Sequence, residues 1–341
     1  MNILIVVSPK QWTGGALIAY HNAVFLHKKN YNITFVIIDR SGTLDIPHYV
    51  YKTLPTIIVQ KYSTNHEKVA NELSTRLSSN YDIVHLHLNE AINIFKRTSI
   101  KGKKIATLHG EYIHKNCHYL DHLICVSDWQ TDNISNNYRG QFSVIKNFLI
   151  PPKTTTEKNI KIFKEKYGIL DSDFIFGSIG RIEIQKRYDI LCKAFSNLDI
   201  PNAKLIVIGD GNDLAYIQSL SKKIIFTGAL PSASQFIPCF DAYVSTPGFE
   251  SFGLTYVEAM YFQKPIITTK NYGALDLLKH TAFFCDLNYK SVMDQLKYVY
   301  HNIKTIKIEY DLDDFNINRY HDQLEAVYSS CLNNKKKRMI S

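Results

Sequence analysis

The stretch P-G-F-E-S-F-G-L-T-Y-V-E-A-M, residues 247–260, is the part of this chain from which its fold is best predicted. A strand-like run over 241–246 leads into it, and a helical pattern over 254–262 leads out. The stretch is therefore predicted to join a strand to a helix N-terminus. Backbone N–H groups there have no partner inside the helix and carry positive potential, so they suit an anion such as a phosphate. Glu250 and Glu258 lie beside this terminus and are suited to bind hydroxyl groups.

Strands alternate with helices on both sides of this stretch. The alternation starts with an apolar strand at 2–8 and continues to a strand at 143–147. A polar run with two prolines follows at 150–157, and the alternation restarts with a helix at 158–167. Apolar strands that alternate with helices are typical of doubly wound α/β domains with parallel sheets. A length of 341 residues suits two such domains.

The last helical pattern follows the sheet of its own domain and is expected to cross back to the first domain. Ligands of doubly wound sheets bind at the carboxyl ends of the strands, so the ligand-binding loops are expected to face a central cleft between the two domains. The predicted organisation is a first domain over 1–149, a linker over 150–157, a second domain over 158–315, a C-terminal helix over 316–334 and a basic tail over 335–341.

Composition and local patterns exclude several classes of protein. The sequence contains no apolar run of about 18 residues, so no membrane span is predicted, and the N-terminus lacks the features of a signal peptide. The six cysteines form no C-x-x-C pair, which favours reduced thiols in a cytoplasmic protein over disulfides or a zinc site. The first loop contains Gly14 and Gly15, which either make a turn or let a ligand approach. It contains no G-x-G-x-x-G motif, which argues against a nicotinamide dehydrogenase.

The formal net charge of +9 includes four cations at 335–338. This tail is interpreted either as a site for an anionic surface or as a solvated, disordered end. A protein that binds nucleic acid would carry basic residues interleaved with aromatic ones on one face. The remaining charge is modest, so nucleic acid is not expected as a partner.

The second half of the chain contains a series of landmarks in a fixed order. They are Gly180-Arg181 with Lys186, V-I-G-D-G at 207–211, F-T-G at 226–228 and the stretch 249–260. In this order they resemble the retaining glycosyltransferases of family 4, which have the GT-B fold.

Two further features extend the resemblance. Glu250 and Glu258 are separated by seven residues, as in the E-x7-E motif of that family. The first half agrees more loosely, at Gly14-Gly15, 82–85, 108–110 and 126–127. The resemblance thus spans residues 1 to about 330.

The resemblance implies a role for each matching residue. Lys186, Arg181 and Gly180 would bind the donor diphosphate, and Glu250 would contact the hydroxyls of the donor sugar. Glu258 would hold the ribose. The first domain would contribute Gly15 near the diphosphate and His109 near the sugar. The loop and helix start that would present backbone N–H groups and a hydroxyl to the sugar and diphosphate are Ser251, Phe252, Gly253, Leu254 and Thr255.

The resemblance also implies a reaction. A sugar would move from a nucleotide diphosphate sugar to a glycan or lipid-linked acceptor with retention of configuration, in the assembly of bacterial surface polysaccharide or lipopolysaccharide. A UDP-sugar is the favoured donor and GDP-mannose the second choice. No metal or cofactor is expected, because fixed cations can stabilise the leaving diphosphate. No protein nucleophile is expected either, because the resemblance implies a front-face reaction in which the donor phosphate helps take the acceptor proton. The expected location is cytoplasmic, with peripheral contact to the inner face of the membrane through the basic tail. The alternative is a GT-B protein that binds a sugar nucleotide without transferring it, or an epimerase.

Several residues have another interpretation or depart from the family pattern. His85 and His87 are interpreted as structural, and His109 has a core or turn role as its alternative. Phe148 and Arg187 occupy positions where the family usually has glycine, which leaves the path of the linker and a local turn open. The D-x-D string at 311–313 is interpreted as surface charge.

Overall fold

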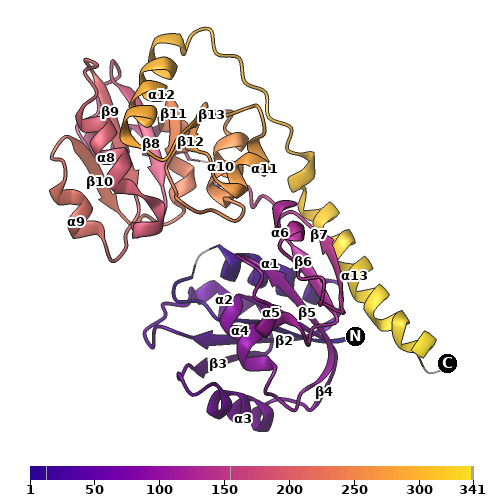
Figure 1. Cartoon of the computed structure of the whole chain (residues 1–341). Coiled ribbons are helices and arrows are strands. Elements are labelled where there is room, and N and C mark those ends of the chain that lie inside the picture. Colours follow the sequence, from indigo (N-terminus) through magenta and orange to yellow (C-terminus); the bar gives the residue numbers. More distant parts are fainter. Residues whose placement is uncertain (13, 154, 339–341) are drawn as a thin grey trace. The chain divides into compact units, whose positions relative to one another are not determined.

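A computed structural model describes residues 1–12, 14–153 and 155–338, with side chains as far as residue 333. The chain divides into two compact units (Figure 1). The first unit contains Met1–Phe148 together with the chain from Phe315 onward, and the second unit contains Leu149–Asp314. The sequence-based boundaries were 149 and 315. The predicted linker 150–157 includes residue 154, which lies outside the described residues.

The first unit is built on a seven-stranded parallel sheet with the order β3-β2-β1-β4-β5-β6-β7. The order reverses direction between β1 and β4. At such a reversal the connecting loops diverge and leave room for a ligand at the carboxyl ends of the strands. The strands are β1 (Asn2–Val7), β2 (Asn32–Asp39), β3 (Ile57–Lys61), β4 (Asn80–His87), β5 (Lys101–Leu108), β6 (His122–Cys125) and β7 (Gln141–Val144).

Helices cover both faces of this sheet because its strands alternate between two buried faces. Leu4 and Val6 of β1 pack in one cluster with residues of α3 and α4. On the opposite face, His85 of β4 contacts Tyr328 of α13. The helices of this unit are α1 (Gly15–Lys28), α2 (His48–Thr53), α3 (His66–Arg76), α4 (Asn89–Phe95), α5 (His114–Cys117), α6 (Trp129–Asp132) and α13 (Ile317–Arg338).

The C-terminal helix α13 packs on the first unit. Asn22 of α1 donates a hydrogen bond of 3.0 Å to the hydroxyl of Tyr320. Phe148, where the sequence left the path of the linker open, is fully buried and packs against Tyr320 and His321 with ring centroids 4.8 Å and 5.4 Å away. A glycine at position 148 could make none of these contacts. Phe148 therefore anchors the end of the first unit under α13.

The second unit contains a six-stranded parallel sheet with the order β10-β9-β8-β11-β12-β13. Its order reverses between β8 and β11, so this pair marks the place where a ligand is expected. The strands are β8 (Phe174–Ile179), β9 (Ala203–Ile208), β10 (Ile224–Gly228), β11 (Ala242–Ser245), β12 (Ile266–Thr269) and β13 (Phe283–Cys285).

Helices α8, α9 and α12 share one apolar cluster with strands of this sheet. The stretch 247–253 connects β11 to α10, as the sequence predicted for a strand–loop–helix. The helices of this unit are α7 (Glu157–Lys166), η1 (Ile184–Lys186), α8 (Tyr188–Ser196), α9 (Leu214–Ser219), η2 (Ala233–Cys239), α10 (Leu254–Tyr261), α11 (Tyr272–Leu278), α12 (Tyr289–Asn302) and η3 (Asp313–Phe315).

The predicted fold class, two doubly wound α/β domains in tandem, is confirmed. All six cysteines are free and buried, as their spacing indicated. No helix in the described part of the chain is both long enough and apolar enough to span a bilayer. The side chains of the predicted basic tail, 335–341, lie outside the described residues, so its role stays a prediction.

Candidate functional site

In the second unit, the candidate residues gather where the sheet order reverses. Strand β8 ends at Ile179 and is followed directly by Gly180 and Arg181. Strand β11 ends at Ser245 and is followed by the loop that carries Glu250. Because β8 and β11 are parallel neighbours, both loops leave the same edge of the sheet. The sequence predicted this edge from its glycines and charged residues.

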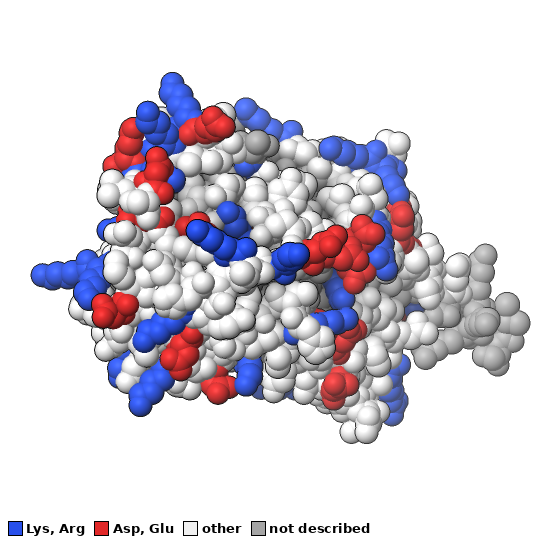
Figure 2. All heavy atoms as spheres, turned by 90° about the horizontal axis from the view of Figure 1, so that it is seen from above, with Lys and Arg blue, Asp and Glu red and all other residues white. Residues whose placement is uncertain are grey.

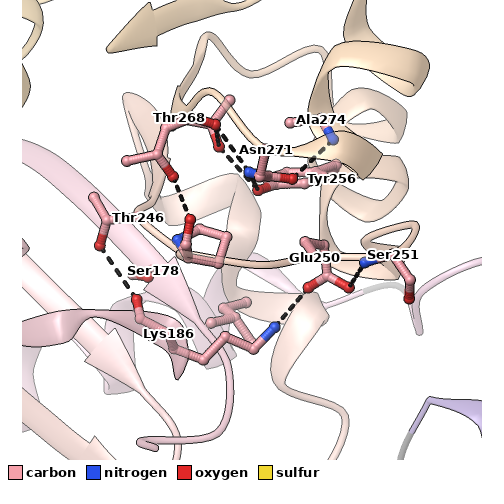
Figure 3. Close-up of polar contacts among 12 residues, drawn as sticks. Ser178, Lys186, Thr246, Glu250, Ser251, Tyr256, Thr268, Asn271 and Ala274 are labelled. Carbon is pink, nitrogen blue, oxygen red and sulfur yellow. Dashed lines mark hydrogen bonds and ion pairs between the residues drawn. The ribbon is translucent and has the colours of Figure 1, made fainter. Parts of the chain in front are cut away.

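An ion pair joins two of the predicted donor-binding residues. The Nζ atom of Lys186 donates to Oε2 of Glu250 at 2.6 Å, and the two side chains point toward each other in Figure 3. Oε1 of Glu250 accepts the backbone N–H of Ser251 at 3.1 Å. The side chains of Lys186 and Glu250 are 26% and 19% exposed, so solvent still reaches the pair.

Backbone contacts explain why these two residues meet across 64 positions of sequence. The N–H of Gly248 donates to the carbonyl of Gln185 at 2.9 Å. The hydroxyl of Thr246 donates to the carbonyl of Arg187 at 3.1 Å. The loop that follows β11 is thereby fastened to residues 185–187. Neither Thr246 nor Gln185 was predicted from the sequence to have a role, since a hydrogen bond to a backbone carbonyl leaves no motif.

The backbone at the start of α10 has a conformation that requires glycine. Gly253 has a φ of 92°, and a Cβ atom at this position would lie 2.3 Å from the ring of Tyr256. Only glycine fits there without strain. The N–H of Gly273 donates to the carbonyl of Glu250 at 2.9 Å, so α11 supports the same loop. Of the predicted residues on this segment, Phe252 is buried, and Ser251, Leu254 and Thr255 are half-buried.

Arg181 and Glu258 have partners other than the ion pair. Arg181 donates to Oε1 of Glu183 at 2.8 Å and is 39% exposed. Glu258 lies one turn inside α10, where burial raises the pKa of its carboxyl to about 7, and a hydrogen bond with Ser234 opposes that shift. The predicted site residues of this unit thus include an ionised pair at the loop and a carboxyl with weakened acidity on the helix.

In the first unit, two predicted residues lie together at the reversal of strand order. Gly15 begins α1, and a Cβ atom added to it would lie 3.0 Å from Cδ2 of His109. His109 follows β5 directly, and its Nε2 lies 3.0 Å from Nδ1 of His87. Burial lowers the pKa of His109 to about 4, so this ring is neutral near pH 7. His87 was interpreted from the sequence as structural, and it is fully buried in this contact.

Gln130 is a residue of this region that sequence reasoning missed. Its side chain donates to the carbonyls of Leu108 and Gly110 at 2.9 Å and 2.6 Å, and its Oε1 accepts the N–H of Val126 at 2.6 Å. These bonds fix the backbone on both sides of His109. A glutamine on a short helix shows no motif, so only the contacts reveal this function.

The arrangement in the second unit is suited to a phosphorylated ligand with hydroxyl groups. Lys186 and the N-terminus of α10 supply positive potential, and a carboxylate such as Glu250 accepts hydrogen bonds from hydroxyls. Among the residues that the structure describes, no group of three or more His, Cys, Asp or Glu side chains is placed to hold a metal ion. Figure 2 shows Lys and Arg interspersed with Asp and Glu on the face in view, so this face is not uniformly basic.

Comparison with known proteins agrees with this geometry. Residues 159–307 match the family model for glycosyl transferases group 1. N-acetyl-alpha-D-glucosaminyl L-malate synthase of Bacillus anthracis is 23% identical over 340 residues, which cover 86% of this chain and 89% of that protein. Alpha-monoglucosyldiacylglycerol synthase of Acholeplasma laidlawii is 28% identical over 180 residues, which cover 49% of this chain and 45% of that protein.

Among solved structures, HepE of Anabaena in complex with UDP and glucose superposes with a TM-score of 0.82 at 15% identity. The superposition covers 97% of this chain and 100% of that chain. The fold is therefore GT-B, as the sequence predicted. Together with the matches of sequence, it supports a glycosyltransferase of group 1 as the class of this protein.

Proposed function

We propose that this protein is a retaining glycosyltransferase of family 4 that moves a sugar from a nucleotide diphosphate sugar to a glycan or lipid-linked acceptor. The observation that carries the proposal is the meeting of Lys186, Glu250 and the N-terminus of α10 at the reversal of strand order in the second unit. A cation, a carboxylate that can bind hydroxyls and the N-terminus of a helix are parts that suit a diphosphate linked to a sugar.

In the proposed reaction, negative charge grows on the diphosphate oxygen as its bond to the sugar breaks. Lys186, Arg181 and the helix terminus stabilise that charge without reorganisation, so no metal or other cofactor is needed in this proposal. The diphosphate draws Nζ of Lys186 away from Glu250, and Glu250 then accepts hydrogen bonds from the sugar hydroxyls. Glu258 holds the ribose. Roles for Gly15 and His109 in this reaction are proposed from the family resemblance alone.

A UDP-sugar is the proposed donor. HepE, a structural relative, was solved with UDP and glucose. GDP-mannose is the second candidate, because a relative that matches 30% of this chain is a GDP-mannose-dependent alpha-mannosyltransferase of Corynebacterium glutamicum. The names of two sequence relatives contain malate and diacylglycerol. We propose a role in surface polysaccharide or lipopolysaccharide synthesis at the inner face of the membrane, where the basic tail would contact anionic lipid.

The proposal is tested with a panel of UDP- and GDP-sugars. Donor binding is measured as a rise in melting temperature, since a ligand that binds only the folded state stabilises it. Nucleotide release is then measured with and without acceptor for wild type and Glu250→Ala. A donor that raises the melting temperature and is turned over by wild type but not by Glu250→Ala supports the proposal. Binding without turnover, with any donor or acceptor, favours the sugar-nucleotide binding protein, and equal turnover by both proteins overturns the role of Glu250.

Lys164→Ala provides a matched control. Lys164 lies in α7 and pairs with Asp171 at 2.9 Å, and its side chain is 26% exposed, as is that of Lys186. Asp171 precedes β8, at the opposite edge of the sheet from Lys186. Loss of a cation there should leave nucleotide release unchanged.

A further inference from the structure

His87, at the end of β4, contacts the imidazole of His109. Its Nδ1 lies 3.0 Å from Nε2 of His109, and the two rings stack with centroids 5.3 Å apart and planes inclined by 25°. His87 itself has no exposed surface. On another side of the His109 ring, a Cβ atom on Gly15 would lie 3.0 Å from Cδ2. His109 is therefore held between β4 and the start of α1.

The backbone after His87 adopts an unusual conformation. Leu88 has a φ of 72° and a ψ of 145°, a combination that side chains rarely adopt and that costs about 1–3 kcal/mol. Strained residues of this kind are concentrated at functional sites, where the surrounding structure forces the conformation. Leu88 also reaches Gly15, whose added Cβ would lie 2.9 Å from Cδ2 of Leu88.

The hydrogen bond between the two rings needs one proton, and its location follows from the burial of His87. If His109 donated through Nε2, the remaining proton of a neutral His87 would sit on its own Nε2, which has no hydrogen-bond partner among the described residues. A buried N–H without a partner is rarer than a buried acceptor without one. The favoured arrangement is therefore donation from Nδ1 of His87 to Nε2 of His109.

Both rings are neutral in this arrangement. Burial lowers the pKa of His109 to about 4, and burial, together with His85 and His109, lowers the pKa of His87 well below its usual value. The ring of His85 lies 4.2 Å from that of His87, and His85 is tied to Tyr328 and Thr107 at 2.7 Å and 2.8 Å. His85 thus supports the ring of His87 without sharing its hydrogen bond.

We propose that His87 is a positioning residue for His109: by donating from Nδ1 to Nε2, it fixes the orientation of the His109 ring and places the ring proton of His109 on Nδ1. This inference rests on the proposed function, in which His109 lies near the donor sugar. A neutral histidine in one tautomer has one defined donor and one defined acceptor, and the partner of one nitrogen determines which is which. A small misplacement of such a group lowers the rate on the order of 100-fold.

The first test reads the tautomer of His109 directly by 15N NMR of the histidine-labelled full chain. The His109 signals among the 13 histidines are assigned by their loss in His109→Gln. We expect Nδ1 of His109 to be protonated and Nε2 to be unprotonated. His87→Leu removes the donor and should give a mixture of tautomers, whereas His87→Asn keeps an amide donor near the position of Nδ1 and should restore the wild-type pattern. A proton on Nε2 in wild type overturns the inference.

The second test measures nucleotide release with the UDP-sugar that wild type turns over. His87→Leu should lower kcat on the order of 10-fold to 100-fold with a smaller change in KM, and His87→Asn should recover most of that loss. His122→Asn is the matched control, because His122 is also a buried strand histidine, with Ser143 as its partner at 2.9 Å. It should leave kcat and the His109 tautomer unchanged.

The two tests separate failure of this inference from failure of the proposed function. If wild type turns over no donor, the proposed function fails, and the tautomer of His109 still decides the role of His87. If wild type is active and His87→Leu retains both its kcat and a single His109 tautomer, His87 is not a positioning residue. If His87→Leu does not fold, the wild-type tautomer and His87→Asn give the decision.

Discussion

The polar side chains at the carboxyl ends of the strands differ in charge between the two sheets. In the first unit, His85, His87 and His109 are kept neutral by burial. In the second unit, Lys186 and Glu250 form an ion pair that solvent still reaches. The same doubly wound architecture thus supports an uncharged hydrogen-bonding edge and a charged edge. A diphosphate needs the charged edge, and a sugar hydroxyl can use either one.

The stability of the two units should depend on pH with opposite sign, and this is the largest effect that we expect. Burial lowers the pKa of His85 to about 3 and the pKa of His109 and His122 to about 4, whereas all three titrate near 6.5 in the unfolded chain. The stability that comes from their neutral state is complete above pH 6.5 and is lost as the pH falls toward 4. From pH 7 to pH 5 each histidine should remove about 2 kcal/mol from the free energy of unfolding.

Hydrogen exchange at pH 7, 6 and 5, corrected for intrinsic rates, measures both units in one experiment. Protection should fall in β4 and β5 of the first unit but not in β8 and β11 of the second. His122→Asn should reduce the loss in the first unit by the share of one histidine. A parallel loss in both units would contradict the contrast between them.

The charged edge should be more sensitive to loss of a charge than any other part of the second unit. Lys186→Ala removes the cation that faces the proposed diphosphate. Loss of one such contact typically costs about 3–4 kcal/mol of transition-state stabilisation, so kcat/KM should fall on the order of 100-fold to 1,000-fold. Steady-state nucleotide release measures this, with Lys164→Ala as the control. If the control loses as much activity, the position of Lys186 at the carboxyl edge carries no special role.

The sequence revealed the charged edge more completely than the neutral one. Glycines and charged residues at fixed spacing predicted the loop that carries Glu250 and named Lys186 as a candidate, but the ion pair between the two side chains was seen only in the structure. The contacts around His109 come from residues such as Gln130, whose partners are backbone carbonyls distant in sequence. A hydrogen bond to a carbonyl constrains the shape of a loop but leaves no pattern of residue types.

The alternation of apolar strands and helices was enough to predict both sheets, because parallel strands are buried on two faces. It was not enough to predict α2, α4, α5, α11 and α12 or the short strand β13. Helices as short as α2 (His48–Thr53) span fewer than two turns, so their apolar periodicity cannot be recognised. Helix α12 (Tyr289–Asn302) is long enough, and its buried positions Val292, Leu296 and Val299 have helical spacing, so its pattern was present in the sequence but was not recognised.

Glu258→Gln tests the pH dependence that is predicted for the second unit. Burial raises the pKa of the Glu258 carboxyl to about 7, above the 4.5 of an unfolded chain. The stability associated with the protonated carboxyl is complete below pH 4.5 and is lost as the pH rises through 7. Glutamine does not titrate, so the stability of the variant relative to wild type should increase by about 3 kcal/mol between pH 4 and pH 8. Chemical unfolding at the two pH values, monitored by hydrogen exchange in β11, measures the difference in stability between the variant and wild type. The same difference at both pH values would contradict the raised pKa.

The smallest effect concerns Arg187, the residue that borders the charged edge and replaces the glycine usual in the family. Its φ of 49° and ψ of 42° are left-handed, which explains why glycine suits this position, since glycine adopts such angles without strain. Arg187 offsets part of that strain through two hydrogen bonds of 3.0 Å to Asp189. Arg187→Ala loses those two hydrogen bonds and keeps the backbone strain, whereas Arg187→Gly loses the hydrogen bonds and also relieves the strain. Glycine should therefore be more stable than alanine by about 1 kcal/mol, the reverse of their usual order at a helix, in thermal unfolding of the two variants. If the alanine variant is the more stable, the left-handed conformation is not the reason that glycine is common at this position.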